Sequence, residues 1–285
     1  MNLTDLPQYV YHYTSMQSLK NIIDHKCIWA TESSYMNDPN EIKYGYEVLK
    51  KELERRDCRK QFDRLVSFPT FFTSFSKEPD LLSQWRAYAK EGGVSIGFPS
   101  AELTSIRDGY VLRSCVYSDD YNRLSELIDW AINIYDSHCE LVSESLFDYS
   151  EAPDPHDPST LAYVFSILLS DIAPLIKHYA YKEEKEVRLI SQTIKNLQKG
   201  KLTYNVLRFN ELEYRASKGI IKPYQIIDIS KALSHIKIII GPNPNRDLAY
   251  KSLNDYLRKK LLAEYQYDTK INDILTMSGV PYRDI

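Results

Sequence analysis

Cysteine is scarce in this sequence and widely spaced: the 285 residues include only Cys27, Cys58, Cys115 and Cys139. This spacing argues against a zinc knuckle and against a disulfide framework. The first residues, MNLTDLPQYV, lack the basic and then apolar order of a secretion signal, and no run is apolar and long enough to span a bilayer. The sequence therefore predicts a cytoplasmic protein with no membrane segment.

An excess of charge of one sign is also lacking, because 36 basic residues stand against 39 acidic ones, for a formal net charge of −3. No field of the whole molecule would recruit nucleic acid or an anionic membrane. There is no GxGxxG, no GxxxxGK[ST] and no GxSxG, so neither a Rossmann site, nor a P-loop, nor a nucleophile elbow is supported. The histidines lack metal-ligand spacing, and no metal site is predicted.

What the sequence does contain is an alternation of short strands and helices, which predicts a single α/β (α+β) domain over 1–285. Strands are expected at 9–13, 27–30, 68–76, 94–98, 109–117, 186–190, 204–209, 220–223, 224–229 and 236–240. Helices are expected at 16–25, 41–65, 80–89 and 246–263. The last strand, IKIII, is apolar enough for a central position covered on both faces. Residues 121–181 are helical in pattern, broken by a proline-rich loop at 151–160, and are predicted to form a helical insertion.

The most informative segment is YHYTSMQSLKNIIDHKCIWAT at 11–31, where a strand ends in His12, Tyr13 and Thr14 before an amphipathic helix. Side chains at such a junction point into a cleft, and the backbone N–H groups at the helix start suit an anion such as a pyrophosphate. The alternative is a hydrogen-bonded histidine at a strand end with no ligand. A turn-rich loop at 33–41 adds Asn37 and Asp38 to the candidate binding residues.

Further polar clusters stand beside other short strands. Glu184 and Glu186 lie two residues apart at a strand start, so both project to one side, where one can orient a ribose hydroxyl and the other a nucleophile. Arg188 either pairs with neighbouring carboxylates or grips a phosphate. Trp85 and Tyr88 either pack in a core or stack on an adenine or nicotinamide ring. An exposed, charged strand edge would also explain KEEKEVR.

Read from end to end, the chain resembles DUF2971, a bacterial family of unknown function. The matching pieces are YHYTS with its helix and the WAT strand, the MNDPNE loop, FTSFS, SQWRAYAKEGGVSIGF, KEEKEVRLI and the late GPN turn. They extend over nearly the whole chain.

The order of these pieces also resembles the ADP-ribosyltransferases, which implies a mixed, split β-sheet and NAD as the substrate. By this resemblance, His12 would hydrogen-bond the ribose of NAD with Thr14 beside it, and Tyr88 or Trp85 would stack on the nicotinamide. Glu186, with Glu184 before it, would stabilise the oxocarbenium-like transition state. FTSFS, with Ser74, is similar to the Ser-Thr-Ser element of the arginine-type subgroup, although that subgroup has arginine where this chain has His12.

The leading hypothesis is thus an NAD-binding, ADP-ribosyltransferase-like protein that cleaves the nicotinamide glycosidic bond, as a toxin or a phage-defence effector. The acceptor of ADP-ribose would be a protein or a nucleic acid, and the oligomeric state is left open. The predicted catalytic residues are His12, Tyr88, Glu184 and Glu186, and the predicted binding residues are Tyr13, Thr14, Asn37, Asp38, Ser74, Trp85 and Arg188. Two alternatives remain open: a non-catalytic nucleotide- or protein-binding module, and a metal-dependent nuclease or hydrolase built on Glu184, Glu186 and His12.

Overall fold

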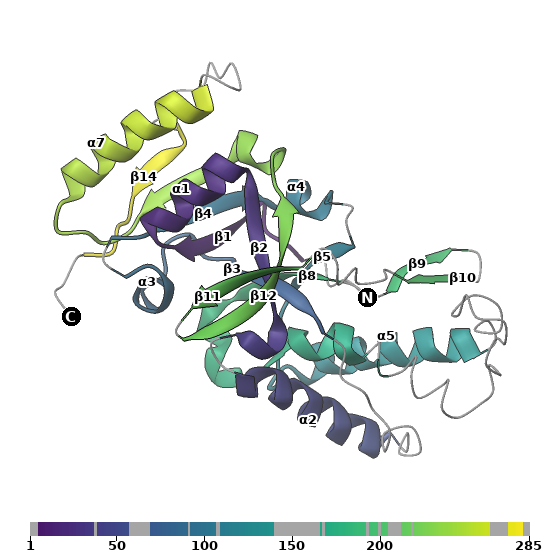
Figure 1. Ribbon diagram of the computed structural model, residues 1–285. Coiled ribbons are helices and arrows are strands. Elements are labelled where there is room, and N and C mark those ends of the chain that lie inside the picture. The colour runs from purple at the N-terminus through teal and green to yellow at the C-terminus, as the bar shows by residue number, and fades with distance from the viewer. Residues whose placement is uncertain are drawn as a thin grey trace.

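A ten-stranded sheet dominates the computed structural model (Figure 1). The structure describes residues 5–36, 39–56, 69–90, 92–106, 109–139, 166, 169–191, 194–198, 201–204, 212–217, 219–262 and 273–281. The strand order is β11-β12-β2-β3-β1-β4-β13-β14, while β8 lies on the other edge of β3 and carries β5 beside it. Its pairs are antiparallel except β13 with β14. The predicted mixed α/β class is therefore confirmed.

The first unit consists of β1 (Tyr9–Thr14), α1 (Met16–His25) and β2 (Cys27–Glu32), close to the predicted ranges. Ser15 caps α1, because its hydroxyl accepts the Ser18 N–H at 3.1 Å. Lys26 ends the helix in the left-handed conformation, with φ of 53°. The helix connects β1 to β2, which both run antiparallel to β3.

The sheet splits at β3 (Phe71–Ser76). One edge of β3 pairs along most of its length with β8 (Glu186–Ser191). The opposite edge pairs at its start with β2, and at its end only through Ser76 with Tyr11 of β1. Since β1 and β2 do not pair with each other in the described ladders, the middle of this edge opens into a gap between them.

Helices cover both faces of the sheet (Figure 1). On one face, α1 and α7 (Arg246–Leu257) pack on the main core, and on the other α2 (Pro39–Arg55) packs with α5 (Tyr121–Cys139) on a second core. Burial of each leucine-sized side chain contributes roughly 1.5–3 kcal/mol. The helical side chains in these cores include Leu19, Ile22, Ile23, Leu253, Leu257, Leu49, Leu53, Leu124, Leu127 and Ile128.

Strands and helices beyond β1 complete one side of the sheet. The elements are α3 (Leu82–Tyr88), β4 (Val94–Pro99), α4 (Ser100–Thr104), β13 (Lys237–Ile240) and β14 (Leu275–Met277). β13 lies inside the sheet as predicted, between β4 and β14. One face is covered as predicted, because Ile238 and Ile240 are buried, whereas the other is covered only in part: Ile239 packs against the cluster of Tyr13 and Trp85, and Lys237 is exposed.

The predicted strand at 109–117 is broken into β5 (Tyr110–Ser114) and β6 (Val116–Tyr117). The break occurs because β5 pairs with β8, whereas β6 pairs in parallel with β7 (Ile176–Lys177) in a separate two-stranded sheet. Residues 121–181 are consequently not helical throughout. The chain before and after β7 forms 3₁₀ turns, at Ala173–Leu175 and Tyr179–Glu184. The predicted loop at 151–160 lies outside the described residues.

The predicted strands at 220–223 and 224–229 form one strand, β12 (Ile220–Asp228), with Pro223 inside it. The proline is accommodated because β12 pairs with β11 (Glu213–Ser217) up to Tyr224 and with β2 from Tyr224 onward. Of the strand predicted at 204–209, only Tyr204 is described. It ends a hairpin of β9 (Ile194–Gln198) and β10 (Lys201–Tyr204).

The predicted ends of two helices lie at or beyond the limits of the described residues. α2 is described to Arg55, and the predicted remainder near residue 65 lies outside the described residues. α7 continues into a π-helical turn at Arg258–Leu262, close to the predicted end at residue 263. None of the helices in the described ranges has the length and apolar character of a membrane span.

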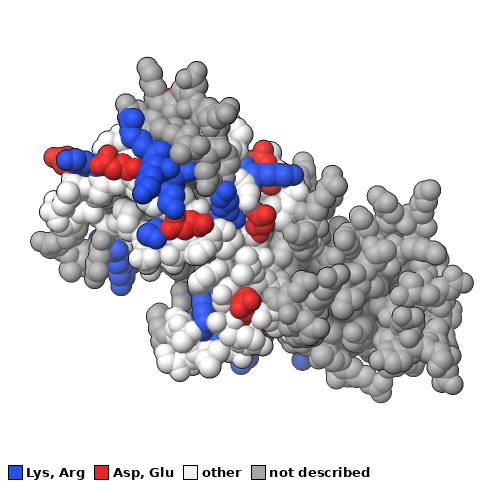
Figure 2. All heavy atoms as spheres, turned by 45° about the horizontal axis from the view of Figure 1, so that its top comes forward, with Lys and Arg blue, Asp and Glu red and all other residues white. Residues whose placement is uncertain are grey.

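Figure 2 shows the molecule with the top of Figure 1 turned toward the viewer. Among the described residues on this face, basic and acidic side chains are interspersed. One ion pair joins α1 to the turn after α7, since Lys260 contacts Asp24 at 2.7 Å, and Lys20 of α1 contacts the same carboxylate at 2.6 Å. That the chain forms a single domain with an insertion stays a prediction.

Candidate functional site

A cavity of about 700 Å³ lies where β1, β2 and β3 separate. We call it the split-sheet cavity. It extends from the gap between β1 and β2 along the sheet face toward β11 and β8. The side chains that line it include His12, Tyr88, Glu184, Glu186, Trp29 and Arg215. The cavity is thus lined by side chains from early and late segments of the sequence.

His12 fills part of the gap in the sheet. Its Nδ1–H donates to the Ser74 carbonyl of β3 at 2.9 Å, a group that no strand pairs with on this edge in the described ladders. The ring lies 5.7 Å from that of Phe75. Burial lowers the pKa of His12, which favours the neutral imidazole. Because Nδ1 holds the proton, Nε2 of the neutral ring is a hydrogen-bond acceptor.

The aromatic residues around the gap have different roles. Tyr13 and Trp85 pack edge to face at 4.7 Å in a small core, and the Trp85 indole N–H donates to Asp80 at 2.7 Å. Trp85 is 3% exposed and does not border the cavity, which speaks against its predicted stacking role. Tyr88 does border the cavity and is 45% exposed. Burial, with the Glu184 and Glu186 charges, raises the pKa of the Tyr88 hydroxyl to about 12.

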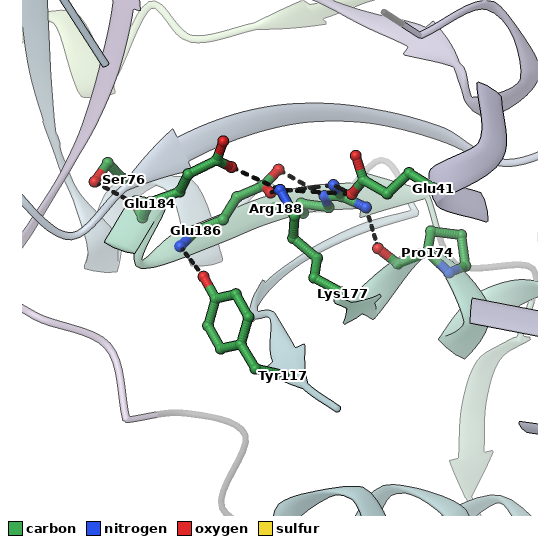
Figure 3. Close-up of polar contacts among 8 residues, drawn as sticks. All are labelled: Glu41, Ser76, Tyr117, Pro174, Lys177, Glu184, Glu186 and Arg188. Atoms are coloured by element: carbon green, nitrogen blue, oxygen red, sulfur yellow. Dashed lines mark hydrogen bonds and ion pairs between the residues drawn. The ribbon is translucent and has the colours of Figure 1, made fainter. Parts of the chain in front are cut away.

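Five charged side chains form a network at one side of the cavity (Figure 3): Glu41, Lys177, Glu184, Glu186 and Arg188. Lys177 contacts all three carboxylates, with Nζ 2.6 Å from Glu184 Oε2 and 3.6 Å from Glu41 Oε1. Arg188 Nε donates to Glu186 Oε1 at 2.7 Å, and its Nη atoms donate to Glu41 and to the Pro174 carbonyl. We call this group the five-charge network.

The network fixes Glu186 more firmly than Glu184. The Glu186 side chain is 6% exposed and contacts both cations, and its backbone N–H donates to the Tyr117 hydroxyl at 2.9 Å. Although burial opposes ionisation, Arg188 and Lys177 lower the pKa of Glu186. The Glu184 side chain is 20% exposed and, among the described residues, has Lys177 as its one cationic partner, and burial raises its pKa. The three carboxylates outnumber the two cations, so the network retains one negative charge when all are ionised.

Arg188 resolves the ambiguity between pairing and phosphate binding. Its side chain is 2% exposed, stacks on the Phe72 ring at 4.2 Å, and donates to groups of the protein. The guanidinium is thereby occupied, and the proposed grip on a phosphate is not supported.

A second group of polar and aromatic side chains lies on β2, β12 and β11. Arg215 Nη2 donates to the Thr31 hydroxyl at 2.8 Å, and the guanidinium lies 5.2 Å from the Trp29 ring and 5.9 Å from the Tyr224 ring. The two rings are 4.6 Å apart. Lys222, directly opposite Arg215, donates to the Tyr35 carbonyl at 2.6 Å. All six residues border the cavity.

The structure thus brings His12, Tyr13, Thr14, Ser74, Tyr88, Glu184, Glu186 and Arg188 to one cavity. Asn37 and Asp38 lie outside the described residues. Sequence reasoning missed Lys177, Glu41 and the Arg215 group. Glu41 could have been predicted as a site residue, because it is the last residue of the MNDPNE segment that carries the family resemblance. In the ranges that the structure describes, no group of three or more His, Cys, Asp or Glu side chains is arranged to hold a metal ion.

The fold and the cavity define a mixed α/β protein with a cavity in a split sheet. Residues 84–189 match the family model described as a protein of unknown function, DUF2971, so the resemblance predicted from the sequence is confirmed over this segment. The matched segment runs from α3 through β8 and so includes Tyr88 and the network residues other than Glu41. No curated protein and no solved structure matches the chain.

Proposed function

We propose that the protein binds NAD in the split-sheet cavity and cleaves the bond between nicotinamide and its ribose, as an ADP-ribosyltransferase-like enzyme. The observation that carries this proposal is the convergence of His12, Tyr88, Glu184 and Glu186, from three distant segments, on one cavity. Its volume of about 700 Å³ is typical of small-molecule sites, which range over roughly 300–1,000 Å³.

His12 and Tyr88 suit the binding of a ribosyl nicotinamide. The neutral imidazole presents Nε2 as an acceptor for a ribose hydroxyl, while Ser74 fixes the ring through Nδ1. The half-exposed Tyr88 ring offers a flat surface to the nicotinamide. The two residues would hold the sugar and the leaving group on either side of the bond that breaks.

The carboxylates suit the chemistry of that bond. On cleavage, the electron pair of the C1′–N bond moves to nicotinamide, which leaves as a neutral molecule, and the ribose carbon becomes an oxocarbenium-like cation. Fixed negative charge beside this carbon stabilises the transition state. Water or an acceptor nucleophile then adds to C1′ and gives up a proton, which a carboxylate can accept.

Within the pair, we assign substrate contact to Glu184 and positioning to Glu186. Glu184 is the more exposed and has one cationic partner, and its raised pKa makes it the better proton acceptor. Glu186 holds Lys177, which in turn holds Glu184 at 2.6 Å. The assignment makes Glu184 the residue whose loss should affect catalysis more than binding.

The test compares two adjacent glutamates. Glu184→Gln should reduce nicotinamide release from NAD by at least about tenfold, as expected for a group that acts in the transition state, with little change in NAD affinity. Glu183→Gln is the control, because Glu183 is exposed and contacts only Ser83 in the described structure, at 3.2 Å. Equal release by both variants and the wild type would contradict the assignment.

A non-catalytic nucleotide-binding module is the second candidate. The observation that favours it is the pairing of Glu186 with two cations, which offsets the negative charge that catalysis would use. It predicts that NAD raises the melting temperature of the wild-type protein with no nicotinamide release, even at high enzyme concentration. Metal-dependent hydrolysis is not favoured, because the carboxylates it requires already contact Lys177 and Arg188.

We extend the proposal to a role in the cytoplasm as a toxin or phage-defence effector, with ADP-ribose passed to water, a protein or a nucleic acid. This role predicts that expression lowers the NAD content of the host cell, and that Glu184→Gln abolishes the effect. An unchanged NAD content on expression of the wild-type protein would argue against it.

A further inference from the structure

The group around Arg215 lies on the same sheet face as the five-charge network, at the other side of the cavity. Strand register relates the two, since Thr31 is directly opposite both Tyr224 and Phe72, and Phe72 is opposite Ile190 of β8. From β11 to β8 is a span of four strand spacings, or roughly 20 Å at about 4.8 Å per strand. The cavity therefore has a carboxylate-rich end and a cationic, aromatic end.

Arg215 is a cation held by uncharged partners. The Thr31 hydroxyl and two aromatic rings contact it, and its Nε atom is buried with no hydrogen-bond partner. Among the described residues, no carboxylate pairs with the guanidinium. Burial lowers the pKa of Arg215, so a bound anion would remove an electrostatic cost.

Lys222 adds to this cost. Like charges directly opposite each other on neighbouring strands are destabilising, and Arg215 and Lys222 occupy such a pair. Beside them the Trp29 ring is 37% exposed and borders the cavity. A phosphorylated nucleoside carries the two matching groups: a phosphate that can pair with a guanidinium, and a flat base that can stack on an aromatic ring.

We propose that Arg215 and Thr31 bind a phosphate group of a nucleotide and that its base stacks on Trp29. The site accepts the nucleoside-phosphate half of a dinucleotide, so the proposal deepens the NAD hypothesis and rests on it for the orientation of NAD. The phosphate site itself stands on the Arg215 group alone and can be tested without cleavage of NAD.

The test measures the affinity of the full-length protein for AMP, adenosine and ribose 5-phosphate by calorimetry. AMP should bind about tenfold or more tightly than adenosine, because a hydrogen bond to a charged group is lost with the phosphate. Arg215→Gln should bring AMP to the affinity of adenosine, and Arg215→Lys should lie between, since it keeps the charge without the planar fork. Trp29→Leu should weaken AMP and adenosine by a similar factor, roughly tenfold.

Two controls keep the result interpretable if a variant folds poorly. Arg55→Gln removes an exposed arginine of α2 and should leave AMP affinity unchanged. In the wild-type protein, inorganic phosphate should compete with AMP but not with adenosine. Equal affinity for AMP and adenosine, or an undiminished AMP affinity in Arg215→Gln, would overturn the phosphate site.

The outcomes also separate this inference from the proposed enzyme activity. AMP binding that depends on Arg215, with no nicotinamide release from NAD, retains the phosphate site and rejects the glycosidase chemistry. Nicotinamide release that persists unchanged in Arg215→Gln, at the same Michaelis constant, retains the chemistry and rejects the site.

Discussion

At the scale of single residues, the candidate site contains charged side chains that are buried together with their partners. Arg188 is 1% exposed and donates to Glu186, Glu41 and the Pro174 carbonyl. Removing one member of a buried ion network leaves its partners without compensation, which costs far more than the loss of an exposed pair. The network is thus a structural requirement as well as a candidate site.

Arg188→Met should accordingly lower the free energy of unfolding by about 3–5 kcal/mol, measured by urea denaturation. Lys182→Met is the control, because Lys182 pairs with Asp119 where the two side chains are 60% and 41% exposed. It should change stability by less than about 0.5 kcal/mol. Equal losses in the two variants would show that the network is not buried as described.

His12 predicts a pH dependence of stability. Its folded pKa is lowered by burial, so the unfolded chain binds more protons once the pH falls below the unfolded pKa of about 6.5. The free energy of unfolding should therefore decrease from pH 7 to pH 5. His12→Gln, which retains a donor for the Ser74 carbonyl, should reduce this slope. Thermal melts of both proteins across that range provide the measurement, and parallel curves would contradict the prediction.

At the scale of elements, α1 connects β1 and β2, the two strands between which the sheet opens. The helix depends on a local cap, in which Ser15 accepts the Ser18 N–H, and on an apolar face of Leu19, Ile22 and Ile23. These are local features, and the sequence alone predicted the bounds Met16–His25. Local pattern is sufficient here because every contact that defines the helix ends lies within a few residues.

Ser15→Ala should lower the free energy of unfolding by about 1 kcal/mol, the usual effect of losing a helix N-cap. Gln17→Ala, on the exposed face of the same helix, should change it by less than about 0.5 kcal/mol. Chemical denaturation of the two variants checks this difference. A larger effect from Gln17→Ala would mean that the cap contributes little.

Other elements depend on partners distant in the sequence, and these were predicted less well. β7 has only two residues and is defined by its pairing with β6, which lies far away in the sequence. The local pattern does not reveal this pairing, and Lys177 was therefore predicted to lie within a helical stretch. β12 was predicted as two strands at Pro223, because the change of partner from β11 to β2 is invisible locally. The candidate site shows the same limit: the residue types of His12, Tyr88 and the glutamates were predictable, whereas their cationic partner Lys177 was not.

At the scale of the whole molecule, the central claim is that one cavity holds a dinucleotide lengthwise, with carboxylates at the nicotinamide end and Arg215 at the phosphate and base end. The most direct measurement is a crystal structure with an NAD analogue whose glycosidic bond cannot be cleaved. We expect a ribose within hydrogen-bond distance of His12 and Glu184, and a phosphate within hydrogen-bond distance of Arg215. A ligand bound outside the split-sheet cavity, or an empty cavity at saturating analogue, would contradict it.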